Sequence, residues 1–106
     1  MQGSVVITVC GDLDMLTAPA LAGAIEAAAR HAPPAIVVDL SGVDFLASAG
    51  MSVLVSAHEN LTPAVGFGVV ASGPATSRPL EVLGIDALIA LYRTLDEACD
   101  DLRPAR

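Results

Sequence analysis

The sequence contains no lysine and no tryptophan, and aromatic residues make up only 3% of its 106 positions. Its five basic residues are all arginines, whereas 12 residues are acidic, which gives a formal net charge of −7 at pH 7. The arginines are scattered along the chain at Arg30, Arg78, Arg93, Arg103 and Arg106. Because proteins that bind a phosphate backbone need clustered Lys and Arg side chains, we expect no direct nucleic-acid partner.

Long hydrophobic runs are also missing. The longest strongly apolar, uncharged run is Phe45–Ala57. It is shorter than the roughly 20 residues that a membrane-spanning helix needs. The N-terminal segment has no basic region and reaches acidic residues by Asp12, so it lacks the pattern of a signal peptide. We therefore expect no membrane insertion and a cytoplasmic location.

Cysteine and histidine are scarce as well. The two cysteines, Cys10 and Cys99, show no CxxC spacing, and we expect buried, reduced thiols, since free cysteine behaves as a small hydrophobe. The two histidines, His31 and His58, have no second His or Cys at ligand spacing. No metal site is therefore expected.

Hydrophobic patterning divides the chain into alternating strands and helices. Apolar, often β-branched runs predict strands at residues 5–10, 36–40, 65–70 and 88–92. Helical spacing and capping residues predict helices near residues 17–30, 50–58, 77–83 and 94–102. Gly84 is expected to end the third helix in a left-handed conformation, and Thr94 and Glu97 to form a capping box at the fourth. The alternation indicates an α/β domain over residues 1–106, with a core of about residues 5–102 and helices against a mostly parallel sheet.

One serine stands where a strand-like segment gives way to a helical one. We expect Ser48 to be the N-cap of the helix near residues 50–58, a role worth about 1 kcal/mol. A phosphoryl group on Ser48 would meet the free N–H groups and the positive dipole end of that helix. It would add about −1.5 to −2 charge units and change the surface offered to a partner without unfolding the domain.

The sequence offers little for catalysis. The patterns GxGxxG, GxxxxGK[ST] and GxSxG are absent, so the usual nucleotide-binding and hydrolase signatures are missing. An enzyme using Ser48 as its nucleophile would need a paired base, and no motif links either histidine to this serine. We therefore predict that the protein is not an enzyme.

The central stretch Ile36–Ser56, IVVDLSGVDFLASAGMSVLVS, resembles the STAS domain of bacterial anti-sigma factor antagonists. That family shows a G-E-L-D-like tetrad followed by D-L-S-x-V-x-F-[M/L]-D-S-[S/T]-G-L-x-V-L. Gly11–Asp14 (GDLD) and Ala18–Leu21 (APAL) fit the earlier part of the pattern. The resemblance covers about Val5–Leu102. It implies a STAS-like fold, a single-layer, mostly parallel (mixed) sheet of about four to five strands with about four helices packed on it.

The resemblance implies a switch in transcription regulation and stress response. In the family, the unphosphorylated antagonist binds an anti-sigma factor, a serine kinase with a histidine-kinase-like ATPase fold, and so frees a sigma factor. The kinase phosphorylates the serine matched by Ser48, and the antagonist then dissociates. ATP and Mg²⁺ belong to the kinase, so the resemblance implies no cofactor for this chain.

The resemblance also implies a partner-binding surface around this serine. Asp14 matches the aspartate of the family tetrad, which lies beside the serine loop at the interface. The expected surface comprises Asp14, Ala47, Ser48, Ala49, Gly50, Met51, Ser52 and Val55. We expect Met51 and Val55 to form an exposed apolar patch, and the acidic surface to favour a partner with basic residues around the contact.

Two departures from the family pattern bear on the switch. Ala47 stands where many members have Asp, and Ala49 where many have Ser or Thr. The missing acidic neighbour weakens the prediction of phosphorylation more than the prediction of binding. The alternative hypothesis is a constitutive STAS regulatory or assembly subunit of a membrane transport system, not phosphorylated. The oligomeric state stays open, with a weak homodimer as one alternative.

Overall fold

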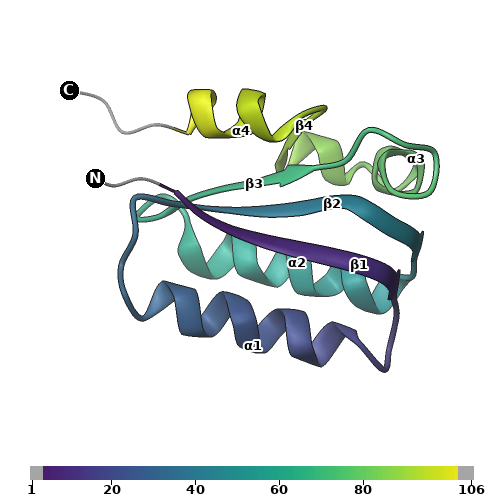
Figure 1. The fold of residues 1–106 in the computed structure, drawn as a ribbon, viewed down its shortest axis with the longest axis horizontal. Coiled ribbons are helices and arrows are strands. Elements are labelled where there is room, and N and C mark those ends of the chain that lie inside the picture. The colour runs from purple at the N-terminus through teal and green to yellow at the C-terminus, as the bar shows by residue number, and fades with distance from the viewer. Residues whose placement is uncertain (1–3, 103–106) are drawn as a thin grey trace.

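The computed structural model describes residues 4–102 as one sheet with helices against it (Figure 1). Its elements are, in chain order, β1 (Val5–Leu13), α1 (Ala18–Ala29), β2 (Ala35–Leu46), α2 (Ser48–Leu61), β3 (Gly66–Val70), α3 (Ser77–Val82), the 3₁₀ helix η1 (Ile85–Ala87), β4 (Ala90–Tyr92) and α4 (Leu95–Asp101). Each predicted strand and helix has a counterpart in this order, so the predicted α/β class is confirmed.

The four strands form a single sheet in the order β1-β2-β3-β4, and every neighbouring pair is parallel. Parallel neighbours need crossover connections, which α1, α2 and the α3–η1 segment supply. Because the strands run the same way, their carboxyl ends lie at one edge of the sheet, on the right in Figure 1. The turn after β1 and the start of α2 meet at that edge.

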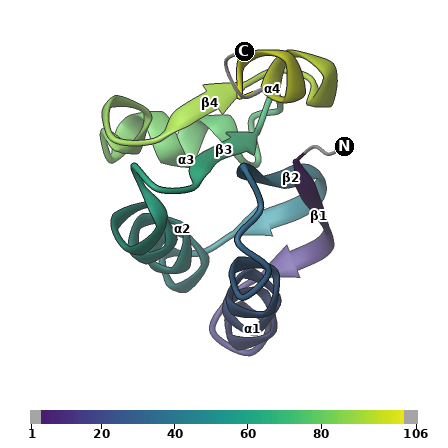
Figure 2. The ribbon, with the colours of Figure 1, turned by 90° about the vertical axis from the view of Figure 1, so that its left-hand side faces the viewer.

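Helices cover the two faces of the sheet unequally. α1 and α2 lie on one face, whereas α4 lies on the other (Figure 2). β2 shows the alternation that this requires: Ile36 and Val38 belong to the larger hydrophobic cluster, which includes residues of α1 and α2. Val37 faces the opposite way and packs with Val70 and Ala98 of α4. Every one of these strand side chains is buried, so the middle of the sheet is sealed on both faces.

β1 and β2 extend farther than the hydrophobic pattern predicts. The sequence favours an end to the first strand at Gly11, but β1 continues to Leu13. Gly11 has φ of 79°, which is accessible without the penalty that a Cβ imposes, and irregularities in the β1–β2 register lie on both sides of it. Pairing then resumes and runs to Leu13 opposite Leu46. This extension carries the end of β1 up to the residue that precedes α2.

The prediction that both cysteines are buried is wrong for Cys10, which is exposed, while Cys99 is half-buried and both are free thiols. Cys10 lies on the edge strand β1, and its Sγ would be 3.0 Å from a Cβ placed on Gly42. α4 packs over β2, β3 and β4, farther across the sheet. The strand-like run around Cys10 therefore has one buried face, and this thiol lies on the other.

The predicted helix end at Gly84 and the predicted cap at Thr94 are confirmed, although the Glu97 carboxylate accepts a different N–H from the one predicted. Gly84 takes the left-handed conformation, with φ of 74°, and Ile85 behind it is buried. The Thr94 hydroxyl accepts the N–H of Glu97 at 3.1 Å, as a capping box requires. The Glu97 carboxylate accepts the N–H of Arg93 at 3.2 Å, where the prediction has that of Thr94. α4 therefore begins with a side-chain cap.

Candidate functional site

Ser48 is the first residue of α2, and its side chain is exposed. The prediction that Ser48 is the N-cap is wrong, because Ala47 occupies that position with an extended backbone and no side chain caps the helix. The Ala47 carbonyl accepts the N–H groups of Gly50 at 3.0 Å and Met51 at 3.2 Å. The first amides of a helix have no acceptor within it, so the Ser48 hydroxyl lies among N–H groups that the helix itself does not use.

The start of α2 is fixed to the end of β1. The Ala47 N–H donates to the Leu13 carbonyl at 2.9 Å. Gly50 approaches the same residue so closely that a Cβ would lie 2.7 Å from Leu13 Cγ. Leu13 is only 1% exposed, so its side chain cannot move aside without disturbing the packed core. Gly50 is thus buried beneath the predicted surface, where it allows the start of α2 to approach the end of β1 closely.

Asp14 organises the turn between β1 and α1. Its Oδ1 accepts the N–H groups of Leu16 at 2.9 Å and Thr17 at 3.2 Å. The Thr17 hydroxyl accepts the Asp14 N–H at 2.9 Å and donates to the Asp12 carbonyl at 2.8 Å. Thr17 occupies the N-cap position of α1, as predicted, but its hydroxyl bonds into the turn and does not cap the helix. The Asp14 carboxylate therefore holds the shape of this turn.

The same turn presents two large apolar side chains to solvent. Met15 is 76% exposed and Leu16 is 86% exposed. Phe45, 55% exposed, lies opposite Asp12 in the β1–β2 pairing, at the same edge of the sheet. We call Met15, Leu16 and Phe45 the apolar rim. Sequence reasoning missed it, although Met15 and Leu16 fall in a predicted loop, where an apolar side chain has no core to enter.

The exposed patch predicted from Met51 and Val55 does not exist as such. Met51 is buried, with 7% exposure, and Val55 is half-buried against the larger cluster. Ala49 is also half-buried, whereas Ser52, one helical turn after Ser48, is exposed. The hydrophobic side chains of α2 turn toward the core, so the apolar part of the surface comes from the neighbouring turn and strand end.

Charge is distributed unevenly around the Ser48 hydroxyl. Asp12 and Asp44 are exposed near the carboxyl edge of the sheet, as the acidic composition predicts. The first turn of α2, however, contains no acidic residue. A carboxylate there would neutralise the positive end of the helix dipole. Without one, the helix start keeps its capacity for an added anionic group.

The surroundings of Ser48 do not supply a catalytic base. His58 lies ten residues further along α2, about 15 Å away at 1.5 Å per residue. Its Nδ1 is buried without a hydrogen-bond partner among the described residues. The Asp14 carboxylate is used in its own turn. Neither His58 nor Asp14 is therefore placed to activate the Ser48 hydroxyl for attack on a substrate.

Metal ligands do not gather anywhere in the described part of the chain. Over residues 4–102, no three His, Cys, Asp or Glu side chains come together in a way that could hold a metal ion. Across the same residues, no helix combines the length and the apolar character needed to span a membrane.

Known proteins are similar to this chain in sequence as well as in fold. The family model described as Mlab, STAS domain matches residues 2–92. RsfB of Mycobacterium tuberculosis, an anti-sigma-F factor antagonist, is 39% identical over 105 residues, which are 99% of this chain and 86% of RsfB. The crystal structure of an anti-sigma factor antagonist from Mycobacterium paratuberculosis is 48% identical, with a TM-score of 0.92, covering 98% of this chain and 89% of that chain.

A more distant structure shows how widely the fold occurs. A sulfate transporter family protein from Wolinella succinogenes has a TM-score of 0.80 and covers 94% of this chain and 84% of its own, but it is only 14% identical. At that identity the likeness concerns the fold alone. Both antagonists are similar to this chain in sequence over almost its full length, and the Mycobacterium paratuberculosis protein is similar in structure as well.

Proposed function

The chain belongs to the STAS domain family, and on this premise we propose that it is an anti-sigma factor antagonist switched by phosphorylation of Ser48. Unphosphorylated, it binds an anti-sigma factor in the cytoplasm and thereby releases a sigma factor. The anti-sigma factor is the serine kinase and holds ATP and Mg²⁺, so the antagonist itself performs no catalysis. Identities of 39% and 48% to anti-sigma factor antagonists support this role within the family.

The observation that carries the switch is the open start of α2 at an exposed Ser48. A phosphoryl group there has backbone N–H groups as hydrogen-bond donors and a positive dipole end beside it. It adds about −1.5 to −2 charge units to a surface that already bears Asp12 and Asp44. The Ser48 hydroxyl caps nothing in the fold, so modification changes the surface and leaves the domain intact.

In the unphosphorylated state, the apolar rim offers the partner an apolar contact surface. A few side chains that become buried on binding carry most of the energy of an interface. Met15 and Leu16 are candidates for this role, because a hydrogen-bonded turn holds them in place before a partner binds. Acidic side chains around them favour a partner with basic residues at the edge of the contact. A phosphate placed among these acidic groups would oppose that contact when the partner also presents its own ATP phosphates nearby.

The test is mass spectrometry of the protein after incubation with ATP, Mg²⁺ and each candidate anti-sigma kinase of its source organism. Three proteins are compared: the parent, Ser48→Ala and Ser52→Ala. Ser52 is a matched control, since it is exposed on the same helix one turn later. We expect a single added phosphate on the parent and on Ser52→Ala, and none on Ser48→Ala.

Binding measured by size exclusion completes the test. Ser48→Glu should remain folded and bind the anti-sigma factor much more weakly than the parent does. Complex formation without any phosphate on the parent would replace the switch with a constitutive binding role, as in a transport-system subunit. No complex with any anti-sigma factor would overturn the antagonist role itself.

A further inference from the structure

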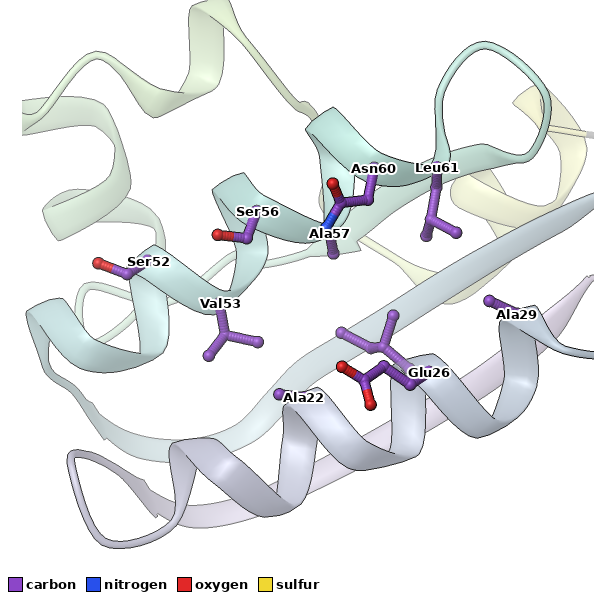
Figure 3. Close-up of a pocket in the computed structure, with 10 residues that line it drawn as sticks. Ala22, Glu26, Ala29, Ser52, Val53, Ser56, Ala57, Asn60 and Leu61 are labelled. Atoms are coloured by element: carbon purple, nitrogen blue, oxygen red, sulfur yellow. The ribbon is translucent and has the colours of Figure 1, made fainter.

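A groove runs between α1 and α2 on the helical side of the domain (Figure 3). Its volume is about 430 Å³, and residues of these two helices alone line it. Pockets for small molecules typically have volumes of roughly 300–1,000 Å³. The groove therefore has the size of a small-ligand site, and it is separate from the apolar rim at the carboxyl edge of the sheet.

Small side chains create this space. Ala22 and Ala29 occupy the side of α1 that faces α2, and Val53 points back from α2 toward α1 (Figure 3). Ala57 of α2 also lines the groove and is buried. A leucine at any of the alanine positions would extend into the space between the helices. The sequence instead leaves it open along about two turns of each helix.

The lining combines an apolar interior with one charge. Ile25 and Leu61 are buried and, with Val53, give the interior its apolar surface. Glu26 is the only charged residue among those that line the groove, and Asn60 is a neutral polar group on the opposite helix. With no arginine in the lining, an anion would find no counter-charge, whereas a cation would find the Glu26 carboxylate.

The volume also limits what can enter. One turn of a helix with its side chains, about 10 Å wide and 5.4 Å long, occupies roughly 420 Å³. The enclosed volume thus equals about one helical turn, so a longer partner helix would leave most of its surface outside the groove. A compact molecule fills the same space completely.

We propose that the α1–α2 groove binds a small organic cation with an apolar body, its ammonium group at Glu26 and its body against Ile25, Val53 and Leu61. This site is additional to the proposed antagonist function and does not depend on it. Three probes of equal chain length separate charge from apolar contact: n-hexylammonium, n-hexanol and n-hexanoate. Backbone amide NMR shifts of the full chain report where each probe binds and how tightly.

The expected order of affinity is hexylammonium, then hexanol, then hexanoate, with saturable shifts at residues of α1 and α2. Glu26→Gln should weaken hexylammonium about fivefold, the scale of an exposed charge pair, and leave hexanol unchanged. Ala22→Leu and Ala29→Leu should each weaken all bound probes about tenfold, since roughly two methylene groups lose their contact. Ala27→Leu is the matched control, because Ala27 is exposed on α1 and does not line the groove.

Three results would overturn the proposal. One is the absence of saturable shifts with hexylammonium on the folded parent protein. Another is equal affinity for hexanoate and hexylammonium, which would make the groove a nonspecific apolar surface. A third is a groove that responds to a basic amphipathic peptide and not to hexylammonium, which would assign it to a protein partner. Thermal melts of every variant confirm that lost binding is not lost folding.

Discussion

The starts of α2 and α4 are built in opposite ways. α4 follows Thr94, whose hydroxyl accepts the Glu97 N–H, and it has Asp96 and Glu97 in its first turn. α2 follows Ala47, has no side-chain cap and has no acidic residue in its first turn. Caps contribute about 1 kcal/mol, and first-turn carboxylates about 0.3–1 kcal/mol each. Local stabilisation is therefore present at the start of α4 and absent beside the exposed Ser48 of α2, and α1 and α3 also begin without a side-chain cap.

Tertiary contacts replace the missing cap at α2. The Ala47 N–H bonds to the Leu13 carbonyl, and Gly50 packs directly on the Leu13 side chain. Both contacts position the helix without occupying the amides beside Ser48. The difference between the two helix starts shows how a site can be rigid and still retain free hydrogen-bond donors for a phosphate.

The largest expected effect concerns the apolar rim, which lies at the edge of the sheet where α2 begins. Met15→Ser with Leu16→Ser should weaken binding of the anti-sigma factor by about 2–4 kcal/mol, the range of interface hot spots, with unchanged stability. Val82→Ser with Leu83→Ser is the matched control, because these side chains are 74% and 60% exposed on and just after α3. Isothermal titration calorimetry measures the affinity of each double variant for the anti-sigma factor. Equal losses for the two double variants would mean that exposure alone, and not position beside Ser48, governs binding.

The next effect concerns the contact that stands in for a cap at α2. Gly50→Ala places a Cβ 2.7 Å from Leu13 Cγ and 3.1 Å from the Leu13 carbonyl oxygen. Overpacking of this kind lowers the free energy of unfolding by about 1–3 kcal/mol. In Gly23→Ala, on α1, the new Cβ meets nothing within 4 Å, so better helix propensity should add about 0.5–1 kcal/mol. Urea denaturation measures the change in the free energy of unfolding, which should be negative for Gly50→Ala and positive for Gly23→Ala. A Gly50→Ala variant that is more stable than the parent would mean that the Leu13 side chain can move to admit the new Cβ.

A smaller effect tests the comparison directly. Thr94→Ala removes the α4 cap and should lower the free energy of unfolding by about 1 kcal/mol. Ser48→Ala removes a hydroxyl that caps nothing and should change it by less than about 0.5 kcal/mol, as for most surface substitutions. The two variants differ from the parent by small side-chain deletions at exposed helix starts. A loss near 1 kcal/mol in Ser48→Ala would show that the hydroxyl caps α2 in solution.

The order of strands and helices could be predicted because hydrophobic period and capping residues are local signals. Gly84 and Thr94 act as the sequence indicates. The ends of β1 and β2 could not, because the strand continues past Gly11 only through a bulged register with its neighbour. Such pairing depends on residues about 30 positions apart in the chain, which a local pattern does not contain.

The sequence predicts where the candidate site lies in the chain but not which of its side chains are exposed. The resemblance predicts that Asp14 lies beside the Ser48 loop, and the Ala47–Leu13 hydrogen bond joins the two residues that precede them. Helical spacing alone, however, does not say which face of α2 is buried, so Met51 could equally have been outside. Its burial depends on the packing of α2 against α1 and the sheet, and the exposure of Met15 and Leu16 depends on the Asp14 turn.

The smallest effect concerns the C-terminal end of α4, where Asp101 accepts a hydrogen bond from the Tyr92 hydroxyl of β4, and the pH dependence of this contact. Burial, and then the hydrogen bond to Asp101, raise the pKa of Tyr92 from 10.0 to about 12. The folded state therefore favours the neutral phenol, and this contribution is complete below pH 10 and lost as the pH rises from 10 to about 12.

Tyr92→Phe removes the titrating group as well as the bond. It should lower the free energy of unfolding at pH 7 by about 0.5 kcal/mol, the low end for a hydrogen bond, because Asp101 is exposed. The difference between parent and variant should then shrink between pH 10 and 12. Denaturation curves at several pH values measure this difference, in which the titration of other groups cancels. A difference that stays constant above pH 10 would mean that Tyr92 has the same pKa in the folded and unfolded states, and that its burial and its hydrogen bond to Asp101 do not favour the neutral phenol.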